Sequence, residues 1–209
     1  MSANTLGICG DVIIEEDGLF NGSGGTVNFK GSSAQSASGA GNADFYNVSI
    51  NNANNVTFDV TAYVESLLTL NSGLLLLGDS HLTLADAATI AGGAFSPTRM
   101  VATTGKGELR KVFDATGSYT YPIGDVSGVV EYTPVTLNFT SGTFGTDAYT
   151  GVLVAGEKFS GNFAATDYLS RYWGVASGGI TGFSCTITFN YLDADIVGTE
   201  ANIKGAKLY

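Results

Sequence analysis

Residues 46–93 read YNVSINNANNVTFDVTAYVESLLTLNSGLLLLGDSHLTLADAATIAGG, and this stretch decides the fold. Its apolar residues occur as pairs that flank one other residue, and each pair begins ten positions after the last: Val48 and Ile50, Phe58 and Val60, Leu68 and Leu70. Leu77 and Leu84 then follow at intervals of seven. Two steps of ten or three of seven give about twenty residues per coil, which is typical of solenoid repeats. The stretch therefore predicts a parallel β-helix.

Stacked coils of this kind bury a common core, because a single coil cannot bury its own apolar side. Asp11–Glu15 and Thr26–Lys30 are predicted to be the first strands. Residues 31–43 contain Ser, Ala, Gly, Asn and one Gln but no large apolar residue, and we expect them to form a surface loop. Asn51–Asn55 predicts a turn between rungs, since asparagine tolerates a left-handed backbone, and stacked asparagines can form ladders.

The pattern changes after Gly93, where rungs are expected to stop and Pro97 appears. We predict an all-β chain with a β-helix domain at 1–97 and an antiparallel β-sandwich domain at 98–209, truncated at its C-terminus. Alternating apolar and polar residues predict the sandwich strands. These strands are Ser118–Ile123, Thr133–Thr140, Tyr149–Ala155, Arg171–Ala176, Phe183–Tyr191 and Ile203–Tyr209.

Composition excludes several classes of partner. The formal net charge is -10 with 9 Lys plus Arg, which are too few cations to neutralise a run of phosphates, so we expect no nucleic acid. The most apolar run, Leu67–Leu77, is short and interrupted by polar residues, so we expect no membrane insertion. Cys9 and Cys185 have no metal-site spacing and make no disulfide framework, and we predict small buried hydrophobes.

Several segments together resemble repeat modules of very large secreted proteins of Bacteroidetes. The resemblance lies in the short Leu-Thr-Leu strands followed, in order, by residues 117–125 (GSYTYPIGD), 132–137 (YTPVTL), 171–173 (RYW) and 189–191 (FNY). Those proteins are cell-surface adhesins and filaments, some linked to gliding motility, that leave the cell by the type IX secretion route. The resemblance implies an extracellular or cell-surface location with neighbouring repeats of the same chain as partners. Its motifs specify a module and no activity.

The sequence contains few residues that could form a catalytic site. His81 is the only histidine, so it is the only candidate base for a Ser-His-Asp or Cys-His site, but an outward-facing polar residue on a coil is favoured. One histidine and two distant cysteines do not make a usual zinc or copper site. The dense acidic run Glu15–Asp17 places adjacent side chains on opposite faces, which does not suit glycoside hydrolysis. We expect no enzyme.

Calcium is the one cofactor that the composition leaves open, because it needs only oxygen ligands. Asp193, Asp195 and Glu200 cluster after a predicted strand, but their spacing does not complete an EF-hand loop. Solvated loop carboxylates are favoured, with a calcium site as the alternative. Asp17 and Asp125 each lie beside a glycine and are predicted to be turn residues.

Tyr172 and Trp173 are the candidate ligand-binding pair, because exposed aromatic rings can stack on a sugar. The favoured alternative places Trp173 and Val175 in the core of the sandwich and Tyr172 on its outer face. The acidic, sparsely charged exterior, rich in Thr and Asn, suits weak contacts, so surface glycans or other cells are further expected partners.

These observations favour a non-catalytic structural or adhesive module that acts as a stiff stalk or filament segment of a multi-repeat extracellular protein. The alternative is a carbohydrate-binding or polysaccharide-cleaving β-helix. A third interpretation is a filament subunit that polymerises end to end. In each case the apolar column of stacked rungs is the feature on which the prediction depends.

Overall fold

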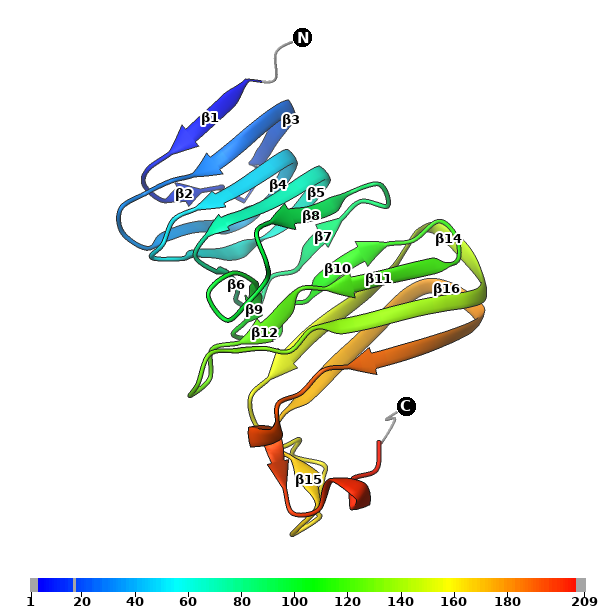
Figure 1. Cartoon of the computed structure of the whole chain (residues 1–209). Coiled ribbons are helices and arrows are strands. Elements are labelled where there is room, and N and C mark those ends of the chain that lie inside the picture. The colour runs from blue at the N-terminus through cyan, green and yellow to red at the C-terminus, as the bar shows by residue number, and fades with distance from the viewer. Residues whose placement is uncertain (1–3, 17, 206–209) are drawn as a thin grey trace.

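The computed structural model describes residues 4–16 and 18–205, and the chain winds into a β-solenoid of about five turns (Figure 1). The predicted all-β class and the β-helix are confirmed. The strands are β1 (Thr5–Ile8), β2 (Val12–Ile13), β3 (Leu19–Phe29), β4 (Gln35–Asn51), β5 (Val56–Ser72), β6 (Leu75–Leu77), β7 (Leu82–Leu84), β8 (Thr89–Gly92), β9 (Val101–Thr103), β10 (Leu109–Val112), β11 (Gly117–Tyr121), β12 (Ile123–Asp125), β13 (Glu131–Tyr132), β14 (Val135–Ala155), β15 (Tyr168–Leu169), β16 (Tyr172–Phe189) and β17 (Ile196–Val197). The 3-10 helices are η1 (Asp193–Asp195) and η2 (Glu200–Asn202). No helix in the two described ranges combines the length and apolar character that a membrane crossing requires.

The first face of the solenoid is a parallel stack of β1, the C-terminal parts of β3, β4 and β5, and then β8 (Figure 1). Successive partners along this face are Leu6, Val27, Val48, Leu68 and Ile90. Their spacings are 21, 21, 20 and 22 residues. The predicted period of about twenty residues per coil is therefore confirmed.

Two further faces complete each turn. Successive partners on the second face are Val12, Ala37, Phe58, Leu77, Thr103 and Asp125. Successive partners on the third face are Ala43, Ala62, Leu82 and Leu109. Leu70, Leu77 and Leu84 lie on the first, second and third face in turn, so the sequence step of seven is the step from one face to the next.

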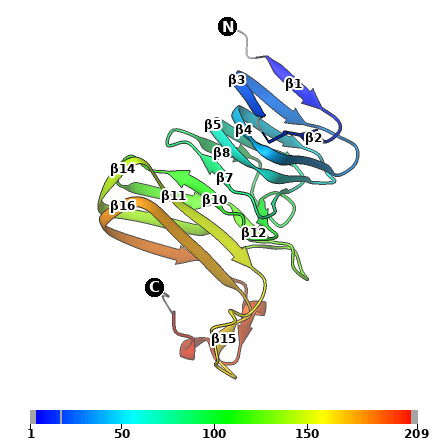
Figure 2. The ribbon, with the colours of Figure 1, turned by 180° about the vertical axis from the view of Figure 1, so that it is seen from behind.

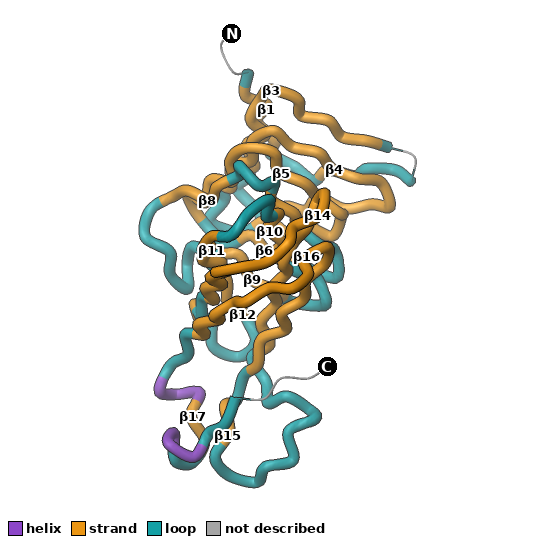
Figure 3. The backbone as a smooth tube through the Cα atoms, turned by 90° about the vertical axis from the view of Figure 1, so that its right-hand side faces the viewer, coloured by secondary structure: helices purple, strands orange, loops and turns teal. Residues whose placement is uncertain are grey.

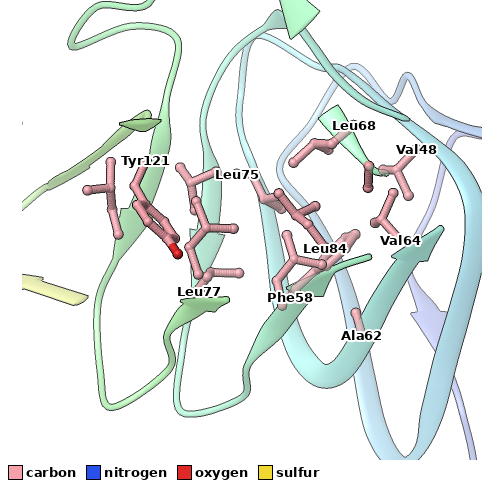
Figure 4. Close-up of a cluster of buried hydrophobic side chains, with 14 of the residues drawn as sticks. Val48, Phe58, Ala62, Val64, Leu68, Leu75, Leu77, Leu84 and Tyr121 are labelled. Atoms are coloured by element: carbon pink, nitrogen blue, oxygen red, sulfur yellow. The ribbon is translucent and has the colours of Figure 1, made fainter. Parts of the chain in front are cut away.

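The core is a column of side chains that point into the solenoid from all three faces (Figure 4). Phe58, Leu68, Leu77 and Leu84 are buried, and the ring of Phe58 lies 5.8 Å from that of Phe45. Full burial of one such side chain stabilises the fold by roughly 1.5–3 kcal/mol. Because each turn supplies several, the column makes the stacked turns stable where one turn would not be.

Residues 35–43 were expected in a surface loop, and that expectation is wrong, because they form the first part of β4. Their backbone pairs in parallel with β2, β3 and β5. Ala37 and Ala43 are both buried, and Ala37 lies in register with the larger Phe58 of the next coil. Backbone pairing on both sides therefore stabilises this strand, although its small side chains do not predict a strand.

The turn at Asn51–Asn55 is confirmed, and it bonds coils to each other. Asn55 has a φ of 73°, in the left-handed region, and its Oδ1 accepts the backbone N–H of Leu74 from the next coil. Asn52 is fully buried, and its Nδ2 donates to the carbonyl of Ser33 at 2.7 Å and to Oε1 of Gln35 at 3.0 Å. This contact between coils pairs asparagine with glutamine and is not the expected ladder of stacked asparagines.

Parallel rungs continue past the expected boundary at residue 97, so the expectation that they stop after Gly93 is wrong. β9 and β12 extend the second face, and β10 extends the third face. The spacing in the sequence does not reveal these rungs, because longer loops separate them. Leu77 and its partner Thr103 are 26 residues apart, and Leu82 and its partner Leu109 are 27 apart.

The chain reverses direction in the last rungs. β14 runs antiparallel to β10 and β11, and β16 runs antiparallel to β14, so β16 regains the direction of the earlier rungs (Figure 2). Fifteen strands form one hydrogen-bonded sheet, and β15 with β17 forms a second. The predicted antiparallel strands are therefore present, but they continue the solenoid sheet, and a separate sandwich is not confirmed.

The segment around β15 and β17 forms a small lobe beyond the last rung (Figure 3). The predicted strand Ile203–Tyr209 is not seen within the described residues, since 203–205 follow η2 without strand pairing. Residues 206–209 and Asp17, which was predicted to be a turn residue, lie outside the described ranges. Both cysteines are free. Cys185 packs half-buried against the core, whereas Cys9 is exposed and is not the buried hydrophobe that was expected.

Candidate functional site

The interior of the second face changes from apolar to polar at its end. Leu77 is followed in register by Thr103 and Asp125, which are only 3% and 1% exposed. Oγ of Thr103 donates to the carbonyl of Val154 at 2.6 Å and accepts its N–H at 2.9 Å. The carboxylate of Asp125 requires a charged partner, because burial of an unpaired carboxylate is strongly unfavourable.

Arg171 supplies that partner from the position just before β16, and its side chain is 2% exposed. Its Nη1 donates to Asp125 Oδ2 at 2.5 Å and to Thr133 Oγ1 at 3.3 Å. Its Nε donates to Asp195 Oδ2 at 2.7 Å, and its Nη2 pairs with Glu131. These five residues, Arg171, Asp125, Glu131, Thr133 and Asp195, are called the Arg171 cluster below.

The Arg171 cluster joins the end of the solenoid to the C-terminal lobe. Asp125 belongs to β12, Glu131 to β13 and Asp195 to η1. Backbone N–H groups also donate hydrogen bonds to these carboxylates. Ser127 donates to Asp125 Oδ1 and Leu192 donates to Asp195 Oδ2, each at 2.9 Å. A guanidinium shared by carboxylates that are already hydrogen-bonded suits a structural ion-pair network, in which loss of one member leaves uncompensated buried charge.

The predicted calcium ligands are not brought together. Asp195 binds Arg171, while Glu200 accepts a hydrogen bond from the hydroxyl of Tyr191 at 2.6 Å and thereby raises the pKa of Tyr191. Asp193 is exposed in η1. No group of three or more His, Cys, Asp or Glu residues that could hold a metal ion occurs in the part of the chain that the structure describes.

Tyr172 and Trp173 are both half-buried and face different surroundings. Trp173 packs its ring 5.0 Å from that of Phe189, and its Nε1 donates to the carbonyl of Thr133 at 3.2 Å. Tyr172 makes an edge contact with Phe159 at 5.2 Å. Because adjacent strand residues point to opposite faces, the two rings do not form one stacking platform. The expected placement of Trp173 against the core agrees with these contacts.

His81 lies between two coils at the start of β7. Its Nδ1 accepts the backbone N–H of Glu108 at 3.1 Å, which requires that nitrogen to be unprotonated. The Glu108 carboxylate lies 3.6 Å from Nδ1 and is bound by Arg110 at 2.8 Å. Burial, then Arg110, lowers the pKa of His81 against an opposing effect of Glu108. His81 is thus a neutral inter-coil acceptor.

A second polar region, around Lys111, was not anticipated as a site. Nζ of Lys111 is held by the carbonyl oxygens of Ala85, Asp86 and Val112. Burial lowers the pKa of Lys111, while Asp86 and then Asp114 oppose that shift. The adjacent surface pocket has a volume of about 180 Å³. This volume is below the roughly 300–1,000 Å³ of ordinary small-molecule pockets.

Sequence reasoning found part of the Arg171 cluster. Asp125 is the predicted turn residue, since it accepts the N–H of Ser127 two positions on, but it is also an interior residue. The available signal was Ile123-Gly124-Asp125, in which alternation places Asp125 on the same side as the apolar Ile123. Arg171 carried no comparable signal, because its partners lie 24 to 46 residues away in the chain.

Comparison with known proteins returned no match: no protein-family model matches the chain, and no curated protein or solved structure matches it either. The resemblance to repeat modules of Bacteroidetes surface proteins therefore stays a prediction. Function has to be inferred from the geometry of this chain.

Proposed function

We propose that this protein is a non-catalytic structural or adhesive module that acts as a stiff segment of a stalk or filament. The observation that carries the proposal is the unbroken apolar column, which is in parallel register across the turns from Leu6 to Ile90. In such a solenoid each turn contacts its neighbours along the whole rung, so a bend at any point must break the hydrogen bonds and apolar contacts of a complete interface between two turns.

The surface and the ends of the column fit this role. The chain has a net charge of -10 with 13% charged residues, which favours solubility and weak, broad contacts over tight binding of one ligand. The reversed strand β14 extends the column past the parallel rungs, and the Arg171 cluster would fix the C-terminal lobe to it. A cell-surface location, with neighbouring repeats and glycans as partners, follows from the sequence resemblance and belongs to the proposal.

A polysaccharide-directed solenoid is the competing function. It is favoured by the half-exposed Tyr172 and its edge contact with Phe159, since aromatic rings at a solenoid surface can stack on sugars. The calcium alternative would accompany either role, because extracellular acidic modules use oxygen ligands.

The deciding experiment is incubation of the purified protein with neutral and uronate-containing polysaccharides, followed by measurement of new reducing and unsaturated ends. The structural role predicts no product above a heat-denatured control. Release of oligosaccharides would contradict it. A glycan array on wild type and Tyr172→Ala then separates adhesion through this ring from a scaffold that binds no glycan.

A further inference from the structure

The last rung of the solenoid leaves an open edge and an open end of the core. β16 is hydrogen-bonded on one side to β14 and has no other partner among the described strands. Inward-facing residues pair across these strands: Val152 with Val175, Leu137 with Ile187 and Val135 with Phe189. The β14 member of each pair is buried, whereas the β16 member is 36% to 40% exposed. The side chains of β16 are therefore core residues that lack a covering rung.

The edge of β16 also lacks the usual protection against pairing. Its 18 residues include no Asp, Glu, Lys, Arg or Pro. Natural edge strands are commonly blocked by such residues, and a long uncharged edge is a template for a further strand. Irregular register is confined to the middle of β16, opposite Phe139 to Tyr149, so its two ends keep regular backbone geometry.

The first rung shows the matching features at the other end of the molecule (Figure 1). β1 pairs only with β3 among the described strands. Leu6 pairs with the buried Val27 and points inward, yet it is 53% exposed, since no described strand lies on its other side. Ile8 pairs with the buried Phe29 in the same way.

Strand direction makes the two ends compatible. β16 is parallel to β10 and β11, because both are antiparallel to β14. β10 lies on the third face and β12 on the second, so β11, which lies between them in the chain, corresponds to the first face. The half of β16 that is aligned with β11 across β14 lies on the same face. β1 also lies on the first face. A β1 strand added to residues 184–189 would continue the solenoid in parallel, with apolar side chains inward.

We propose that the edge of β16 binds the β1 edge of a second copy of this chain, so that molecules stack head to tail into one continuous solenoid. The contact joins different surfaces on the two partners, so it does not close into a dimer and propagates as a filament. This inference rests on the proposed structural role and names its partner.

Sedimentation velocity over a range of concentrations tests the β16 end. Wild type is expected to form species larger than the 21.5 kDa monomer as concentration rises, and negative-stain electron microscopy should show unbranched fibres. Ile187→Lys should weaken association by about a hundredfold or more, because it places an unpaired ammonium inside the joined column. Asn138→Lys, at an exposed outward position of the neighbouring strand β14, adds the same charge away from the edge; it is the matched control and should associate like wild type.

Mixing of two end-blocked variants tests the polarity. Leu6→Lys blocks the β1 end and Ile187→Lys blocks the β16 end, so each alone should be monomeric. An equimolar mixture should form a one-to-one dimer and nothing larger, because one free end of each kind remains. Thr5→Ser, an uncharged change on the outward side of β1, is the control for the β1 end and should associate like wild type. Association of Leu6→Lys alone would mean that β16 pairs with itself and would overturn the inference.

Circular dichroism checks that each variant keeps its strand content, and Phe189→Lys, the next inward position of residues 184–189, replaces Ile187→Lys if the latter unfolds. Wild type that stays monomeric at every concentration would also overturn head-to-tail stacking. That result would leave the structural role standing, since polysaccharide cleavage and glycan binding are measured separately.

Discussion

Among the described residues, the turns before Gly93 bury apolar and uncharged polar side chains only, whereas the part of the chain after it also buries the charged Lys111, Asp125 and Arg171. The early turns repeat the same contacts every 20 to 22 residues on the first face. The late turns have longer loops, reverse their direction and join segments through ion pairs. A solenoid can therefore be extended by repetition, but its end in this chain is built from unique long-range contacts.

The difference also separates two kinds of stability. Removing one apolar side chain from the column lowers the free energy of unfolding by a limited amount, because neighbouring side chains relax in part into the cavity. Removing one member of a buried ion-pair network lowers it more, because the remaining charges stay buried without compensation. Substitutions in the two regions should therefore differ in size and in how far their effects spread.

Arg171→Ala should have the largest effect. It leaves the carboxylates of Asp125 and Asp195 buried without their guanidinium, and we expect a loss of about 3–5 kcal/mol in the free energy of unfolding. Urea unfolding gives that value, and hydrogen exchange should show faster exchange in β17 and η1 than in β5. Arg110→Ala is the control, because its partly exposed pair with Glu108 and its contact with the ring of Tyr149 are together worth about 2 kcal/mol or less. Equal losses of unfolding free energy for both variants would contradict a special contribution of the buried ion pairs to the stability of the late turns.

Leu77→Ala should come next, at about 2–5 kcal/mol, because it opens a cavity in the column between Phe58 and Thr103. Leu76→Ala alters the neighbouring half-buried position on the other side of β6 and should cost less. Thermal unfolding followed by circular dichroism measures both. A larger loss for Leu76→Ala would mean that the interior column is not the main source of stability in the early turns.

Gly73→Ala tests the tight corner between coils. Gly73 has a φ of 78°, and a Cβ at this position would lie 1.9 Å from the carbonyl oxygen of Asn52. We expect a loss of about 1–3 kcal/mol from backbone strain alone. Gly117→Ala is the matched control, because a Cβ there meets nothing within 4 Å and its φ is not in the left-handed region. Similar unfolding midpoints for the two variants would contradict a strained corner.

The early turns were predictable because their information is local. The spacing of Leu70, Leu77 and Leu84 encodes the step between faces, and the alternation of Val27 and Phe29 encodes the inward side. Residues 35–43 were missed because their strand is held by neighbouring backbones and not by side-chain size. Propensity alone cannot report pairing that other coils supply.

The late turns and the Arg171 cluster were less predictable because their information is distant. Asp125 and Arg171 are 46 residues apart, and no local pattern links them. Antiparallel alternation in Val135, Leu137 and Phe139 correctly indicated strands, but alternation does not specify which sheet a strand joins. The expected sandwich and the observed continuation of the solenoid sheet have the same local sequence requirements.

His81 gives the smallest predicted effect and lies where the two regions meet, between β7 and the loop before β10. Its pKa in the folded protein lies below the ordinary value of 6.5, so the unfolded chain binds the proton more readily. The contribution of neutral His81 to stability is therefore complete above that value and is lost as pH falls through the lower folded pKa. Urea unfolding at about pH 7.5 and about pH 5.5 should show a slightly larger acid loss for wild type than for His81→Gln, which does not titrate. Equal acid losses would show that this inter-coil contact does not distinguish the protonation states, and a larger loss for His81→Gln would reverse the predicted sign.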